Sequence, residues 1–286
     1  MEPRQLASDA VEAPQVEPDS LSEAHYLGFD QATDRHRMGL RPLGENWLEP
    51  DRHRDWQLQL KQALIRSDRE MYVADPTTSV AQTGVARLAE MLSLDKRIEP
   101  TIEACGLATQ EDWCIMVRED TWRLRAASVC FPSRWVLSEK LGGTLADIHE
   151  PVPNYEKDLG GLVESFFDRL DQKRAVWRLN WELWDDPRLS QPWRNEEAEI
   201  FDLPPANLVP EKIFLRVERQ TMRRLTDETI VFSIRVHQRP LADVIKQPEA
   251  LLQLQSVFLG EGGPVLAAKK LGSLTVPVLE WLAGTV

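Results

Sequence analysis

The sequence has few cysteines, and their arrangement is not typical of a metal site or a disulfide framework. The 286 residues contain three cysteines, Cys105, Cys114 and Cys130, and no C-x-x-C pair. An odd, scattered set of thiols argues against a disulfide scaffold, a four-cysteine zinc site and an iron–sulfur cluster held by this chain alone. We therefore expect a cytoplasmic protein with reduced thiols. Any redox chemistry would need a bound cofactor or electrons supplied by another protein.

Long hydrophobic runs and an excess of basic charge are also lacking. No stretch of 18 apolar residues occurs, and the first 20 residues lack the apolar core of a secretory signal. The 46 acidic residues outnumber the 34 lysines and arginines, which gives a formal charge of -12. That balance disfavours nucleic acid or an anionic membrane as a partner. A hydrophobic content of 42% is typical of a globular chain with a sizeable core.

Common site motifs are missing as well. The chain has no G-x-G-x-x-G or G-x-x-x-x-G-K-[ST] segment, so it offers no standard cradle for nucleotide phosphates. It has no G-x-S-x-G or H-E-x-x-H motif either. The five histidines are His25, His36, His53, His149 and His237. They are too far apart in sequence for a local metal chelate, so a site with several histidines would need assembly by the fold.

The composition changes along the chain and suggests one large domain behind a tail. Residues 1–24 contain six acidic residues, one arginine and three prolines, which predicts a disordered acidic tail. Residues 25–286 are predicted to form a single domain with its core at about 110–240. Within it, apolar residues at helical spacing predict helices at 56–64, 86–94 and 98–107.

Short apolar and alternating runs then predict strands. The compact apolar run 113–117 and the run 122–131, which alternates at first, are expected to form a hairpin. A second hairpin is expected from 213–221 and 230–236, and the alternating run 176–184 is expected to form a further strand. Helical composition is expected over 136–148 with a break at Gly142 and Gly143, from Pro240 to about 258, and over 277–282. This order predicts an α+β fold, an antiparallel sheet with flanking helices.

His149 is the most informative histidine, because it lies at the predicted end of a helix in the string IHEPVP. The prolines that follow would fix the backbone. A single histidine on a helix that faces a sheet is able to ligate haem iron, since haem needs one protein bond and an apolar slot. The alternative is a histidine that interacts with the terminal carbonyls of the helix. The sequence pattern leaves both open.

The predicted hairpin at 213–236 carries the densest charge. Arg216 and Glu218 are expected on one face of its first strand and Arg219 on the other, while Arg235 lies among apolar residues of the second strand. One interpretation is a cross-strand ladder of salt bridges on a solvated face. The other is a polar cluster over a cofactor, in which a carboxylate orients an amine and a guanidinium holds an anion or a propionate. Spacing does not decide between them.

Six segments in the same order resemble one known family. They are RMGLRPL (37–43) with Trp47 and Asp51, LRAASVCFPSRW (124–135), KLGGTLADIHEPVP (140–153), Asn180-Trp181, LRVERQTMRRL (215–225) and FSIRVHQRPL (232–241). In these segments, which span about 26–241, the chain resembles the alpha subunit of haem-dependent oxidative N-demethylases.

The resemblance implies a PAS-like fold in which an antiparallel sheet and a helix grip haem b. It also implies oxidative removal of a methyl group from a small, dimethylamine-like secondary amine, which releases formaldehyde and a primary amine. Oxygen is the oxidant, and NADPH supplies electrons through FMN and 2Fe-2S cofactors on partner subunits.

For the site, the resemblance makes His149 the expected axial ligand of the haem iron. It places Glu218, Arg219 and Arg235 near the haem or the substrate as candidate catalytic residues, and Arg216 and Trp181 near the cofactor. A carboxylate suits a cationic amine, and a guanidinium suits bound oxygen or a propionate. Two alternatives remain, a haem-based gas or redox sensor and a haem-free PAS-like interaction module.

Overall fold

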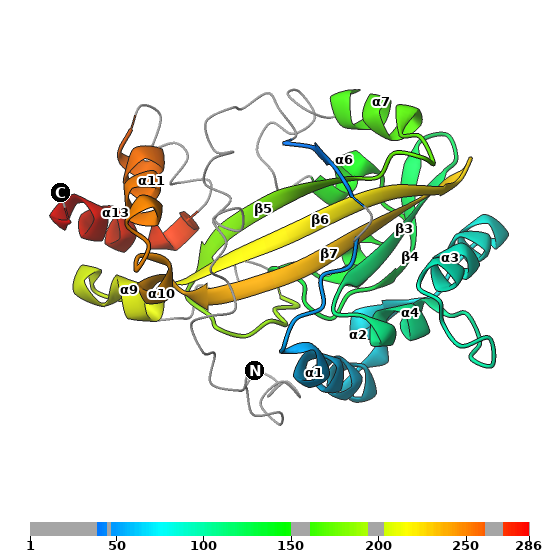
Figure 1. Cartoon of the computed structure of the whole chain (residues 1–286), viewed down its shortest axis with the longest axis horizontal. Helices are drawn as coiled ribbons and strands as arrows, with labels where there is room; N and C mark the ends of the chain where they lie inside the picture. Colours follow the sequence, from blue (N-terminus) through cyan, green and yellow to red (C-terminus); the bar gives the residue numbers. More distant parts are fainter. Residues whose placement is uncertain (1–38, 45–46, 150–160, 194–202, 261–270, 286) are drawn as a thin grey trace.

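A seven-stranded antiparallel sheet organises the computed structural model, which describes residues 39–44, 47–149, 161–193, 203–260 and 271–285 (Figure 1). The strands run in the order β1-β5-β6-β7-β3-β4-β2 across the sheet. Their bounds are β1 Arg41–Pro42, β2 Val73–Ala74, β3 Asp112–Arg118, β4 Trp122–Ser128, β5 Val176–Trp184, β6 Phe214–Thr226 and β7 Thr229–Pro240. The predicted acidic tail lies outside the described residues.

Two hairpins form the centre of the sheet, and each joins two largely buried strands by a short polar turn. β3 and β4 pair through their turn at 119–121, and β6 and β7 pair around Asp227 and Glu228. The hairpins join where β3 pairs with β7, for example at Ile115 opposite Val231. This contact brings together segments that lie more than 100 residues apart in the sequence, so it sets the architecture.

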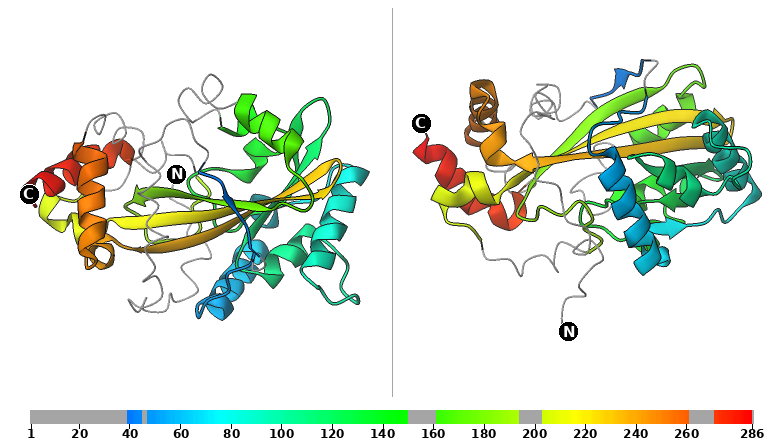
Figure 2. Two further views of the ribbon diagram at one scale, coloured as in Figure 1. Left: turned by 45° about the horizontal axis from the view of Figure 1, so that its top comes forward. Right: turned by 60° about the horizontal axis from the view of Figure 1, so that its bottom comes forward.

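Strand alternation gives the sheet two faces, named here after two neighbouring residues of β6. The Glu218 face carries Arg216, Glu218, Gln220 and their cross-strand neighbours, and the Arg219 face carries Val217, Arg219 and theirs. The helices that cover the Arg219 face lie in two groups at opposite ends of the long strands (Figures 1 and 2).

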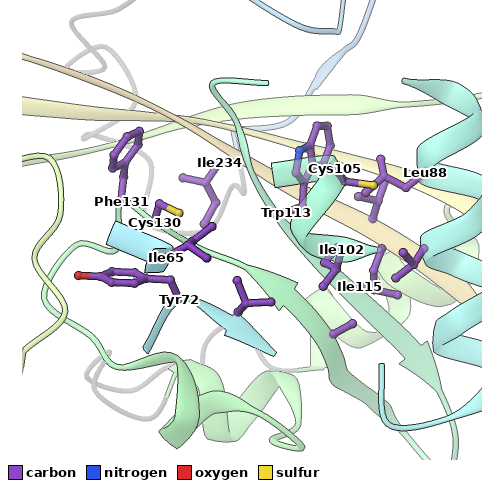
Figure 3. Packing of buried hydrophobic residues seen from close by; sticks show 14 of the residues in the cluster. Ile65, Tyr72, Leu88, Ile102, Cys105, Trp113, Ile115, Cys130, Phe131 and Ile234 are labelled. Carbon is purple, nitrogen blue, oxygen red and sulfur yellow. The ribbon is translucent and has the colours of Figure 1, made fainter. Parts of the chain in front are cut away.

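The N-terminal helices form the first group on the Arg219 face. They are α1 Arg54–Ser67, α2 Arg69–Tyr72, α3 Ser79–Met91 and α4 Ile102–Ala108. Their apolar residues meet Trp113 and Ile115 in one buried cluster (Figure 3). α3 approaches the sheet closely at Gly84, where a Cβ would lie 3.1 Å from the Cγ2 atom of Ile115. The hydroxyl of Thr78 accepts the backbone N–H of Ala81 and caps this helix.

The C-terminal helices form the second group on the same face. They are α9 Val209–Lys212, α10 Leu241–Val244, α11 Pro248–Leu259 and α13 Thr275–Gly284, with 3-10 turns at Ala206–Leu208 and Gly272–Leu274. Their apolar residues pack against Leu215 and Val217 of β6 and Leu183 of β5. The expected single helix from Pro240 to about 258 is wrong, because α10 ends at Val244 and Pro248 begins α11. Proline at the first helical position starts a helix rather than continuing one.

Shorter helices cover the Glu218 face. They are α5 Leu137–Lys140, α6 Leu145–His149 and α7 Gly161–Arg169. Leu145 and Phe167 lie in one apolar cluster with Met222 and Ile230 of the sheet. The predicted break at the Gly142–Gly143 pair is confirmed, and Gly142 has the positive φ of 81° that favours glycine. α6 therefore reaches the same face as Glu218.

Most of the predicted elements are confirmed, and the chain has the mixed α+β architecture expected from the sequence. The short elements β2, α2 and α9 and the helix α7 were not predicted. The structure contains no helix, within the described ranges, of the length and apolar character that a membrane span requires.

Candidate functional site

The charged residues predicted on β6 and β7 are buried, so the structure does not place them on a solvated face. Arg216 and Arg235 are 1% exposed, Arg219 is 4% and Glu218 is 8%. They divide between the two faces of the sheet, with Arg216 and Glu218 on one and Arg219 and Arg235 on the other. The structure therefore brings the candidates together in two pairs rather than in a single cluster.

Glu218 lies at the centre of a hydrogen-bond network on its face. Its Oε1 accepts the hydroxyl of Ser133 at 2.5 Å, and its Oε2 accepts the side-chain amides of Gln220 at 2.8 Å and Asn180 at 3.4 Å. All three donors are neutral. No lysine or arginine forms an ion pair with this carboxylate within the described part of the chain.

Arg216 holds the segment that follows β4 against the sheet. Its Nε donates to Ser133 Oγ at 2.7 Å, its Nη1 donates to Gln238, and its Nη2 donates to the carbonyls of Phe131 and Leu189. Complete burial lowers the pKa of the guanidinium, and nearby carboxylates led by Glu218 oppose that effect. Arg216 thus uses its donors on the protein itself, and it reaches Glu218 through Ser133.

Arg219 and Arg235 bind the segment 47–51 on the opposite face. Arg219 Nη1 donates to the carbonyl of Trp47 at 3.0 Å, and its Nε pairs with Glu49 at 3.1 Å. Arg235 Nη2 pairs with Asp51 at 2.7 Å. Burial by itself would raise the pKa of Asp51, but Arg235 and the hydrogen bonds that Asp51 accepts lower it overall. These arginines anchor a crossing segment of the chain.

His237 lies beside this anchor, next to the same carboxylates. Its Nε2 is 3.7 Å from Glu49. Complete burial lowers the pKa of His237 to about 4, with Glu49 acting in the opposite direction. The imidazole is therefore neutral near pH 7, beside the two ion pairs that Arg219 and Arg235 form.

The remaining two candidates lie apart from each other. Trp181 is on the Arg219 face, where its ring meets Phe258 of α11 edge-on at 5.8 Å. The structure therefore places Trp181 in the core under the C-terminal helices. His149 is the last residue of α6, and its side chain lies outside what the structure describes. Its helix packs on the Glu218 face through Leu145, so the backbone position is on the same side as the carboxylate.

Fold and site define an α+β protein whose sheet carries a buried carboxylate with neutral partners on one face and anchored arginines on the other. Residues 87–260 match the family model of the haem-dependent oxidative N-demethylase, alpha subunit-like. The chain belongs to that family. This match confirms the resemblance inferred from the six segments, and it indicates haem dependence, oxidoreductase chemistry and membership of a multi-subunit system. The comparison with curated proteins gives no significant match.

The Glu218 face offers apolar side chains and a guanidinium, the kinds of group that contact a haem and its propionates. Val176 and Phe232 offer apolar contact there while remaining half-buried, and Arg178 adds a half-buried guanidinium suited to a propionate. The helix of His149 borders this area. No group of three or more His, Cys, Asp or Glu side chains able to hold a metal ion occurs among the described residues. Haem iron needs only one protein ligand, so the absence of such a group does not count against haem.

Sequence reasoning missed the partners of Glu218. Asn180 appeared in a family-like string, but nothing in the pattern placed it opposite Glu218, where the register of β5 and β6 puts it. Ser133 is 85 residues from Glu218 in sequence, and no local signal links them. The alternation of β5 was sufficient to place Arg178 on the same face of the sheet as Asn180, because the two residues are two positions apart in one strand.

Proposed function

We propose that this chain is the haem-binding subunit of an enzyme that removes a methyl group oxidatively from a small, dimethylamine-like secondary amine. Oxygen and two electrons from a partner reductase convert the amine to a primary amine, formaldehyde and water, with two protons consumed. The family supports the class of chemistry. The PAS-like character is supported by the antiparallel sheet with helices inserted between β4 and β5.

One observation carries the choice of a cationic substrate. Glu218 is a buried carboxylate whose contacts, within the part of the chain described, are all with neutral donors. The buried guanidinium nearby, that of Arg216, reaches Glu218 only through Ser133 and forms no direct ion pair with it. A buried carboxylate is costly without a direct cationic contact, and an alkylammonium ion would supply one. In this proposal Glu218 binds the amine nitrogen and accepts a proton from it. Asn180 and Gln220 keep the carboxylate oriented.

The haem would be held on the Glu218 face, and His149 would ligate its iron. When bound, the haem would activate oxygen with electrons that the partner reductase supplies. In this proposal the NADPH site, the FMN and the 2Fe-2S cluster lie on partner subunits. The three cysteines of this chain are buried, and burial raises the pKa of the thiols of Cys105 and Cys114 to about 12.

The other candidates act indirectly in this proposal. Arg219 and Arg235 hold residues 47–51 across the sheet and so support the strand that presents Glu218 from its other face. Arg216 supports Ser133. Trp181 contributes packing beneath the C-terminal helices.

The first test is an absorption spectrum of the full chain with haem supplied. We expect a Soret band that His149→Ala abolishes or shifts, while His53→Ala leaves it unchanged. An unchanged spectrum in the His149 variant would remove that residue as the ligand. A chain that takes up no haem at all would contradict the proposal and favour an interaction module.

The second test measures formaldehyde from dimethylamine with haem-loaded protein and an artificial reductant. Glu218→Gln keeps the size of the side chain and removes its charge, so we expect kcat/KM to fall at least a hundredfold. Glu111→Gln is the matched control, because Glu111 is also buried and accepts a backbone N–H, that of Glu49. Equal activity of the two variants would contradict the role of Glu218. Haem binding without any turnover of dimethylamine would favour a sensor.

A further inference from the structure

The turn after β4 is fixed from both sides before it reaches Glu218. Asp112 accepts the backbone N–H groups of Cys130 and Phe131 at 3.0 and 2.8 Å. Its charge is matched by Lys61 at 3.0 Å, and both of these side chains are fully buried. Arg216 then binds the carbonyl of Phe131. The backbone that precedes Ser133 is therefore held in place by hydrogen bonds at Cys130 and Phe131.

The residue after Ser133 has an unusual conformation. Arg134 has a φ of 57°, in the left-handed region that a bulky side chain rarely adopts. The conformation is maintained by Arg134's own contacts, a pair with Asp185 and a stack 3.9 Å over the ring of Trp184. The backbone N–H of Arg134 also donates to the carbonyl of Gln191. Such strain persists only where surrounding contacts over-determine it, and it is concentrated at functional sites.

The direction of the Ser133 hydroxyl follows from its neighbours. Its oxygen accepts the Nε–H of Arg216 at 2.7 Å, and a guanidinium has no acceptor. The single hydroxyl proton must therefore point elsewhere, and Glu218 Oε1 lies 2.5 Å away. The two hydrogen bonds thus run in one direction: Arg216 donates to Ser133, and Ser133 donates to Glu218.

We infer that Ser133 is a positioning residue that aims one oxygen of Glu218 and leaves the carboxylate available to a small alkylammonium ion. Ser133 itself does not touch the substrate. This inference rests on the proposed function, because it needs Glu218 to bind the amine. The strained turn at Arg134 and the four hydrogen bonds of Arg216 serve to hold one serine hydroxyl in place.

The test measures equilibrium binding of dimethylammonium chloride to the full, haem-loaded chain by calorimetry. Loss of a hydrogen bond to a charged group weakens binding substantially, so we expect Ser133→Ala to raise the dissociation constant about tenfold. Ser133→Thr keeps the hydroxyl and is expected within about threefold of the wild type on the same grounds. Ser233→Ala is the matched control, since Ser233 is buried on the Arg219 face and bonds Thr221.

A double variant separates positioning from a structural effect. In a Glu218→Gln background, adding Ser133→Ala is expected to change the dissociation constant less than twofold, because its target has lost the charge. An effect that is equally large in both backgrounds would overturn the inference. If Ser133→Ala does not fold, Ser133→Cys replaces it, and wild-type binding in that variant would also overturn the inference.

Failure of the proposed function gives a different result. If the wild type binds dimethylammonium no better than Glu218→Gln does, the amine site itself is wrong and the inference falls with it. If Glu218→Gln loses binding while Ser133→Ala behaves like Ser233→Ala, only the role of Ser133 is wrong.

Discussion

The pair Lys61–Asp112 offers a sharp test of how this fold is held together. The two atoms of the pair are 3.0 Å apart, and both side chains are 0% exposed. Lys61 Nζ also donates to the carbonyls of Glu111 and Gly106, at 2.6 and 3.3 Å. The pair joins α1 to the start of β3 and to the end of β4. We consider the substitution Asp112→Asn, which preserves the shape of the side chain.

The cost of this change comes from two sources. Removing one partner of a buried pair leaves an uncompensated charge on Lys61, which costs about 3–5 kcal/mol. In the wild type, the backbone N–H groups of Cys130 and Phe131 each donate to one carboxylate oxygen of Asp112. The NH2 group of asparagine is a donor, so it would leave one of these N–H groups without an acceptor. An unsatisfied buried donor costs about 1–3 kcal/mol. The contributions overlap, so we expect a loss of about 4 kcal/mol in the free energy of unfolding.

Urea unfolding followed by tryptophan fluorescence measures this loss directly. The matched control is Glu90→Gln, because Arg87 and Glu90 are 2.8 Å apart but 59% and 65% exposed. A solvent-exposed pair of this kind contributes less than about 0.5 kcal/mol. A loss of under about 1 kcal/mol for Asp112→Asn, well below the buried-pair range, would refute the reasoning that burial makes this pair indispensable.

Two further predictions concern packing and pH. Gly106→Ala places a Cβ 2.1 Å from the Oγ atom of buried Ser128, so we expect a loss of about 1–3 kcal/mol in unfolding free energy. Gly161→Ala, where a Cβ meets nothing within 4 Å, is its control, and equal urea midpoints would contradict the prediction. For His237, burial depresses the folded-state pKa to about 4 from 6.5, so the unfolded state binds more protons between these values. Stability is therefore lost as pH falls from 6.5 towards 4, and urea midpoints at pH 7 and 5 should differ less in His237→Gln than in the wild type.

The sequence predicted the sheet well because its strands carry their own local signal. The apolar run of β3, the alternation in β4 and β5 and the apolar runs of the β6–β7 hairpin are enough to identify each strand and its turns. The contact between β3 and β7 has no such signal, since it depends on which apolar faces meet after folding. β2 was missed for a related reason, because its two residues have no period to detect.

The site was harder to predict than the strands. Alternation correctly separated Glu218 from Arg219, whereas the family resemblance placed Glu218, Arg219 and Arg235 near the haem or the substrate without distinguishing the faces of the sheet. Which face would receive the segment 47–51 depends on tertiary contacts, such as the bond from Arg219 to the carbonyl of Trp47. No pattern within β6 or β7 contains that information.

The difference between the two faces of β6 supports assigning chemistry to only one of them. On the Arg219 face Arg219 and Arg235 pair directly with Glu49 and Asp51, and the imidazole of His237 is neutral. On the Glu218 face a carboxylate is buried among neutral donors, and the strained turn at Arg134 lies beside it. A protein that needed only stability would pair this charge directly or remove it, since a buried carboxylate that reaches its guanidinium only through Ser133 is costly. The charge that β6 leaves without a cationic contact in the described structure is thus best explained by a cationic ligand that binds there.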